Sequence, residues 1–175
     1  MYEIGQQVIY GTHGVCTISA IESMRVGNTT SDFYVLQPIG QPDSKYYIPL
    51  QNQAALAKVR PLLSRQELLA LIHSDAVRQD VWVADENQRK LRFRQILSQG
   101  EHSLILSMIY CLHKHKITQQ SLGRKLHISD ESFLKDAEKL MNAEFSQILG
   151  MASSQIGPFI LREMELSEPN GMSEG

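Results

Sequence analysis

The chain has 175 residues, of which 42% are hydrophobic, and its formal net charge is −2. The high apolar content and low net charge argue against a disordered chain. No apolar run reaches the roughly 18 residues that span a bilayer. The first residues, MYEIGQQ, lack the basic and apolar regions of a signal peptide. The two cysteines, Cys16 and Cys111, lie far apart in the sequence and form no CxxC pair, so no disulfide framework is expected. This cysteine usage predicts a cytoplasmic location.

The sequence pattern of residues 1–63 predicts β-strands. Short β-branched or aromatic runs alternate with turn residues such as Gly11, Gly14 and Gly27. The expected strands are Gln7–Tyr10, Val15–Ser23, Asp32–Leu36, Lys45–Leu50 and Val59–Leu63, with a helical turn over residues 51–57. Five short strands at this spacing favour a small, strongly bent barrel.

From Ser64 the hydrophobic period becomes that of helices. Ser64 and Glu67 have the spacing of a capping box, so residues 64–80 are expected to form a helix followed by a linker. Further helices are expected over residues 84–99, 102–115 and 118–126, followed by a long helix that Ser129 caps. The period fades beyond Gly150, which predicts a partly disordered tail at 151–175. The fold class is therefore α+β, with an all-α domain at 81–150.

The charge is unevenly distributed along the chain. Residues 81–128 contain eight Lys and Arg against three Asp and Glu, whereas residues 129–175 contain three against nine. The pattern predicts local rather than general contact with a polyanion. Arg89, Lys90, Arg92 and Arg94 form the densest basic cluster.

The sequence VIYGTHGVCTI, residues 8–18, places His13 beside Cys16 in a Gly-bounded bend. No third group that could orient a Cys–His pair is recognisable, so we interpret the bend as a hairpin corner without catalytic function. A second group, Cys111, His113, His115 and His127, has residue types that bind zinc. Its spacing does not place four ligands together, so no metal or other cofactor is predicted.

The N-terminal half resembles the CarD/CdnL-type bacterial transcription regulators, whose β module also occurs in transcription-repair coupling factors as the RNA polymerase-interacting domain. The residues that carry the resemblance are EIGQQVIYGTHGVCTISAIE at 3–22, YVL at 34–36, IPL at 48–50 and VR at 59–60. Two helical segments, RKLRFRQILSQGE at 89–101 and LKDAEKLMNAEF at 134–145, are also similar to this family.

The resemblance implies a Tudor-like barrel that binds the β subunit of RNA polymerase and a helical domain that contacts promoter DNA. It implies no enzymatic activity, membrane contact or small-molecule substrate. The implied polymerase-binding residues are Met24, Arg25, Lys45, Tyr47, Ile48 and Pro49. The implied DNA-binding residues are Trp82, Arg89, Lys90, Arg92 and Arg94, with Trp82 as an apolar wedge at the edge of the melted promoter or, alternatively, as a core residue. The family usually has Arg at the position of Tyr47, and its Trp usually lies about one helical turn closer to Gly100.

Residues 118–140 offer an alternative function. Their Gly and apolar residues imitate the spacing of a helix-turn-helix, which would make the protein a sequence-specific repressor. The second helix of that motif would carry several acidic residues, which suit DNA phosphates badly.

Overall fold

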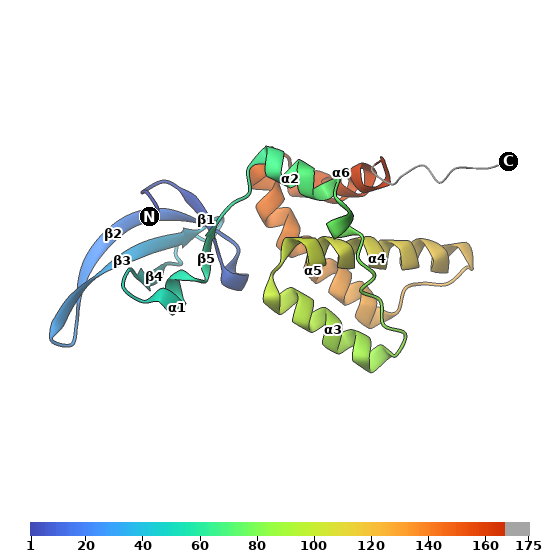
Figure 1. The fold of residues 1–175 in the computed structure, drawn as a ribbon, viewed down its shortest axis with the longest axis horizontal. Helices are drawn as coiled ribbons and strands as arrows, with labels where there is room; N and C mark the ends of the chain where they lie inside the picture. The colour runs from blue at the N-terminus through green and yellow to red at the C-terminus, as the bar shows by residue number, and fades with distance from the viewer. Residues whose placement is uncertain (167–175) are drawn as a thin grey trace. The chain divides into compact units, whose positions relative to one another are not determined.

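The computed structural model describes residues 1–166, which form two compact units that divide after Leu62 (Figure 1). The first unit is an antiparallel sheet and the second is a set of helices, so the predicted α+β class is confirmed. Each unit has its own buried core. No helix within residues 1–166 combines the length and the apolar character of a membrane span.

The first unit contains five strands in the order β4-β3-β2-β1-β5, all antiparallel. Their bounds are Gln7–Tyr10 for β1, Val15–Val26 for β2, Thr29–Pro38 for β3, Tyr46–Pro49 for β4 and Val59–Pro61 for β5. A 3-10 turn, η1 (Gly11–His13), follows β1, and a short helix, α1 (Gln53–Leu56), precedes β5. Because β4 and β5 stand at the two ends of the strand order and no ladder joins them, hydrogen bonds do not close the sheet into a barrel.

The sheet bends along β2 and β3, the long ribbon at the left of Figure 1. Its pairing register shifts between Ile18 and Ala20, and an inserted residue of this kind bends and twists a strand. One face of the sheet buries the core of the unit, which includes Val8, Ile18 and Leu36. The turn before β2 depends on Gly14, whose φ of 81° strains any residue with a Cβ atom.

The second unit begins at Leu63 and contains five α-helices among the described residues. They are α2 (Arg65–Ile72), α3 (Glu86–Gln99), α4 (His102–Ser121), α5 (Ile128–Leu149) and α6 (Ser153–Leu166), with a 3-10 turn, η2 (Asp75–Val77), after α2. The predicted capping box is confirmed at α2. The Ser64 hydroxyl accepts a bond from the Glu67 amide at 3.1 Å, and the Glu67 carboxylate accepts one from the Ser64 amide at 2.8 Å.

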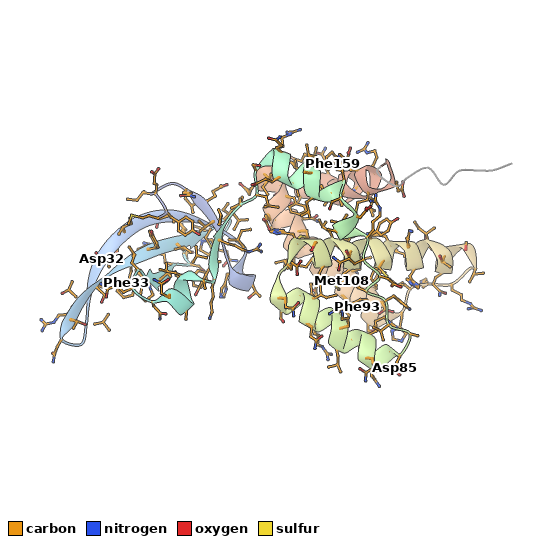
Figure 2. All side chains as sticks on the ribbon, in the orientation of Figure 1. Asp32, Phe33, Asp85, Phe93, Met108 and Phe159 are labelled. Carbon is orange, nitrogen blue, oxygen red and sulfur yellow. The ribbon has the colours of Figure 1, made fainter. Side chains whose placement is uncertain are left out.

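The helices pack around one apolar core. Helix α4 lies against α3 and α5, and α6 lies against α5 and α2. Phe93 of α3 and Met108 of α4, labelled in Figure 2, are both fully buried. The segment 64–80, expected to be a helix followed by a linker, also belongs to this core, because Leu68 and Ile72 of the helix and Val77 after it are fully buried.

Helix α4 is longer than the sequence pattern predicted. It continues past His115 to Ser121, so residues 118–126 do not form a separate helix. The chain then turns at Gly123, where the Arg124 amide donates to the Gln119 carbonyl at 2.8 Å. The expected cap at Ser129 was also wrong, because the His127 side chain accepts from the Ser129 amide and caps α5.

Helix α6 occupies most of the segment that we expected to be a tail. Gly157 and Pro158, which weaken or interrupt helices, hid it in the sequence. The helix forms because Ile156, Ile160 and Met164, spaced four residues apart, are buried in the core of the unit. Residues 167–175 lie outside the described part of the chain.

This packing makes a prediction for α6. Ile160→Ala should lower the free energy of unfolding by about 2–5 kcal/mol, because it removes a buried side chain and leaves a cavity. Arg162→Ala, at an exposed position of the same helix, should change it by less than about 0.5 kcal/mol. Urea unfolding of both variants checks this, and equal stabilities would mean that α6 does not pack as described.

Candidate functional site

Strand β4 forms one end of the sheet and offers an unpaired edge. Within residues 1–166 its one partner strand is β3, with Tyr47 opposite Val35 and Pro49 opposite Phe33. The Pro49 carbonyl already accepts from the Asn52 amide at 3.2 Å, so Tyr47 is the residue of β4 best placed to offer free backbone groups. The free backbone groups of an edge strand can pair with a strand of another chain. Tyr47 is 43% exposed, and Lys45, two residues earlier, is exposed as well. We call the exposed edge and side chains of residues 45–49 the β4 edge.

The register shows which implied polymerase-binding residues share a face of the sheet. Side chains alternate between faces, and Tyr47, Pro49 and Met24 pair with Val35, Phe33 and Ser31, which occupy alternate positions of β3. These three side chains therefore lie on one face.

Ile48 and Arg25 point to the other face by the same alternation. Ile48 is 2% exposed and belongs to the core, so its side chain cannot contact a partner. This corrects the expectation that the Ile48 side chain binds polymerase. Its side chain instead packs in the core and holds β4 in place. Arg25 lies at the far end of β2, where its Nε donates to the Gly27 carbonyl at 3.3 Å.

The His13–Cys16 corner has no arrangement for nucleophilic chemistry. Cys16 is fully buried, and this burial raises the pKa of its thiol to about 11, so the thiol is protonated at neutral pH. The His13 ring lies 5.0 Å from that of Tyr10 and 4.5 Å from that of Tyr46. The corner therefore packs aromatic rings beside the sheet.

In the helical unit, Arg89 and Asp130 form a buried ion pair. Arg89 Nε and Nη2 donate to the two Asp130 carboxylate oxygens, each at 2.9 Å, and the side chains are 7% and 2% exposed. Arg89 Nη1 also donates to the carbonyls of Val83 and Ala84, at 3.0 and 3.2 Å. Because its guanidinium group is enclosed, Arg89 does not contribute to an exposed basic surface, which corrects its expected contact with phosphate.

Trp82 is half-buried and contacts two charged or polar side chains. Its ring centroid lies 3.5 Å from that of His115 with the planes 15° apart, and Arg89 Cζ lies 4.2 Å from the ring centroid. Burial and, secondarily, Arg89 lower the pKa of His115, which favours the neutral imidazole. These contacts fit a packed ring, and an apolar wedge would have to leave them.

The other basic residues of α3 reach solvent on two flanks of the helix. Lys90 and Arg94, four residues apart, share one flank, and Arg92 lies on the other. Lys90 pairs with Glu86 at 2.9 Å, which lowers the pKa of that carboxyl group. Within residues 1–166, Arg92 and Arg94 take part in no hydrogen bond or ion pair, so their charges are available to a ligand.

The corner between α4 and α5 is where the helix-turn-helix alternative would place its second helix. The first turn of such a helix must reach base edges. Here Asp130 in that turn is buried against Arg89, and Glu131 lies 3.3 Å from Lys116 of α4. Both side chains of this first turn are therefore engaged by residues of α3 and α4, which argues against contacts with base edges.

The residues with zinc-binding side chains make separate contacts. His113 Nε2 lies 2.6 Å from the Glu138 carboxylate, and His127 Nδ1 lies 2.8 Å from the Ser129 hydroxyl. Burial raises the pKa of Cys111 to about 11, which opposes a thiolate ligand. No three His, Cys, Asp or Glu side chains converge as metal ligands in the described part of the chain.

Sequence reasoning missed the two residues that hold this region together, Asp130 and His115. They lie 41 and 33 positions from Arg89 and Trp82, and no local spacing connects them. The only signal was an acidic residue in the first turn of a helix, which is common because it favours the helix dipole.

Comparison with known families gives a match for the first unit. Residues 2–62 match the model of the CarD-like/TRCF RID domain, about a third of the chain, and the helical unit lies outside this match. No curated protein matches the chain.

The buried ion pair makes a prediction for stability. Arg89→Ala should lower the free energy of unfolding by about 3–5 kcal/mol, because it leaves the Asp130 carboxylate buried without its partner. Arg94→Ala, at an exposed position of the same helix, is the matched control and should cost less than about 0.5 kcal/mol. Chemical unfolding measures both, and a small loss for Arg89→Ala would show that the pair is not buried in solution.

Proposed function

We propose that the first unit, which matches the CarD-like/TRCF RID domain over residues 2–62, binds the β subunit of bacterial RNA polymerase through the β4 edge. The observation that carries this proposal is the unpaired strand, with Tyr47 and Lys45 exposed beside it, in a domain of this family. Tyr47 and Lys45 supply an aromatic and a cationic contact where the family usually has Arg.

The geometry of the edge supports binding by strand addition. An extended partner segment can pair with the free backbone groups of β4, while neighbouring side chains provide specificity. Pro49 and Met24 lie on the same face as Tyr47 and extend the contact across β3 to β2. Arg25 lies on the opposite face, and we assign it no role at the β4 edge.

We propose that the helical unit contacts promoter DNA through phosphate groups. Lys90, Arg92 and Arg94 supply the positive charge, and none of them is fully buried. Contacts with phosphates position a protein on DNA without reading its sequence. Docking of the first unit on polymerase would raise the local concentration of this weak DNA-binding surface.

Together the two contacts would make the protein a non-enzymatic regulator of open-complex stability. A protein that binds the melted promoter more tightly than the closed one shifts the equilibrium by the difference in binding free energy. A difference of about 1.4 kcal/mol is enough for a tenfold shift. Trp82 would contribute as a wedge only if it leaves His115 and Arg89 on DNA binding, so its packed state is the starting point for that step.

The polymerase contact can be tested on the full chain. The double substitution Lys45→Glu, Tyr47→Glu should weaken binding to purified bacterial RNA polymerase core enzyme by at least about tenfold, because it removes the aromatic contact and reverses the charge. Both side chains are exposed, so the fold should survive, and circular dichroism checks this. Lys58→Glu, which reverses the charge of an exposed lysine outside β4, is the control for charge reversal as such. Undiminished binding of the double variant would refute the proposed docking edge.

The DNA contact can be tested by its salt dependence. Three phosphate contacts predict a slope of about −3 for log affinity against log salt concentration. Arg94→Ala should make the slope shallower by about one, whereas Arg162→Ala on α6 should leave it unchanged. Fluorescence anisotropy with duplexes of unrelated sequence gives these slopes. Strong selectivity for one palindrome would instead favour the helix-turn-helix alternative, whereas affinity independent of salt would refute the phosphate contacts.

A further inference from the structure

A groove between the end of α4 and the beginning of α5 has no role in the function proposed above. It has a volume of about 550 Å³ and takes its walls from one face of each helix, with residues 125 and 126 between them. The lining residues are Lys116, Gln120, Lys125, Leu126, Ile128, Glu131, Ser132 and Lys135. The four from α5 are spaced at i, i+3, i+4 and i+7, which places them in one row along the helix.

The groove is apolar where the chain enters α5. Ile128, the first residue of that helix, is 87% exposed, and the half-buried Leu126 lines the groove beside it. Large aliphatic side chains at such exposure leave apolar surface in contact with water, and a patch of this kind rimmed by polar residues is typical of an interaction site. No aromatic side chain lines the groove, so it offers no platform on which a nucleic-acid base could stack.

The rim of the groove is positively charged. The groove is lined by three lysines, Lys116, Lys125 and Lys135, and by one acidic residue, Glu131. The Glu131 carboxylate is already paired with Lys116, whose Nζ lies 3.3 Å from Glu131 Oε1. Lys125 and Lys135 are exposed and take part in no ion pair within residues 1–166. A partner that matches the groove must therefore carry negative charge around an apolar anchor.

We propose that this groove binds an acidic protein segment that inserts an aliphatic or aromatic side chain against Ile128 and Leu126. The two unpaired lysines would bind carboxylates on either side of the anchor, and Ile128 would lose its contact with water. A DNA backbone would satisfy the lysines and leave the apolar surface exposed. A membrane surface requires a continuous apolar helix face, whereas the apolar stripe of α5 is buried in its own unit.

The test uses the full chain and a short fluorescein-labelled peptide of Glu and Leu residues, with anisotropy as the readout. Peptides in which Ser replaces Leu, or Lys replaces Glu, serve as ligand controls. Ile128→Ser should lower the affinity for the Glu/Leu peptide about tenfold, because it removes the apolar contact without a change of charge. Lys125→Glu, Lys135→Glu should lower it at least as much, and with a loss that shrinks at high salt.

The matched control variants lie on α3. Leu91→Ser removes a 52% exposed aliphatic side chain, and Lys90→Glu, Arg94→Glu reverses two exposed or half-exposed charges. Both should leave the affinity for the peptide unchanged, although the second should weaken binding to DNA if the function proposed above is correct. The two proposals can therefore fail separately.

Three outcomes would overturn the inference. The first is that the Glu/Leu peptide does not bind. The second is that the Glu/Ser peptide binds equally well, which would reduce the site to a charge contact. The third is that Ile128→Ser lowers binding of a short DNA duplex or of phosphatidylglycerol vesicles while the affinity for the peptide does not depend on the groove residues. That result would identify a nucleic-acid or membrane surface instead.

Discussion

The arrangement of the helical unit depends on the buried ion pair between Arg89 and Asp130. Two charges removed from water are costly unless their geometry and remaining hydrogen bonds compensate, and here both Arg89 nitrogens that face Asp130 are satisfied at 2.9 Å. The same guanidinium group holds the carbonyls of Val83 and Ala84 and contacts the Trp82 ring. One side chain therefore links α3 to α5 and to the segment before α3, and this determines which side of α3 is buried and which of its basic side chains face solvent.

The fold also changes what the charge distribution means. The sequence separates a basic stretch at 81–128 from an acidic one at 129–175, but four of the five acidic side chains of α5 face α3 or α4. The cross-helix pairs are Arg89 with Asp130, Lys116 with Glu131, His113 with Glu138 and His102 with Glu144. Arg89 and Lys116, two of the eight Lys and Arg residues of the basic stretch, are thus balanced inside the unit, and the part left for a polyanion is smaller than the sequence suggested. This is the physical reason for expecting weak, salt-sensitive DNA binding.

Local patterns predicted the elements that local interactions determine. Strand β1 has its predicted bounds, Gln7–Tyr10, and the capping box at Ser64 forms as expected, because alternation and capping depend on neighbouring residues. Helix α6 was missed because Gly157 and Pro158 signal a break, whereas burial of its apolar stripe overrides them. The buried position of Arg89 was missed for a similar reason, since its partner lies 41 residues away.

The β4 edge illustrates how a short strand can be exposed for a partner and still be protected from unspecific pairing. The strand has only four residues, and Pro49 at its end has no N–H group to donate, so a partner strand could form few hydrogen bonds with it. A short ladder gives little affinity by itself, so the side chains beside it must supply the rest. Tyr47 provides exposed aromatic area and Lys45 provides charge, while Ile48 holds the strand to the core from the opposite face. Recognition would thus require both the backbone edge and the side chains, which restricts the edge to partners that match both.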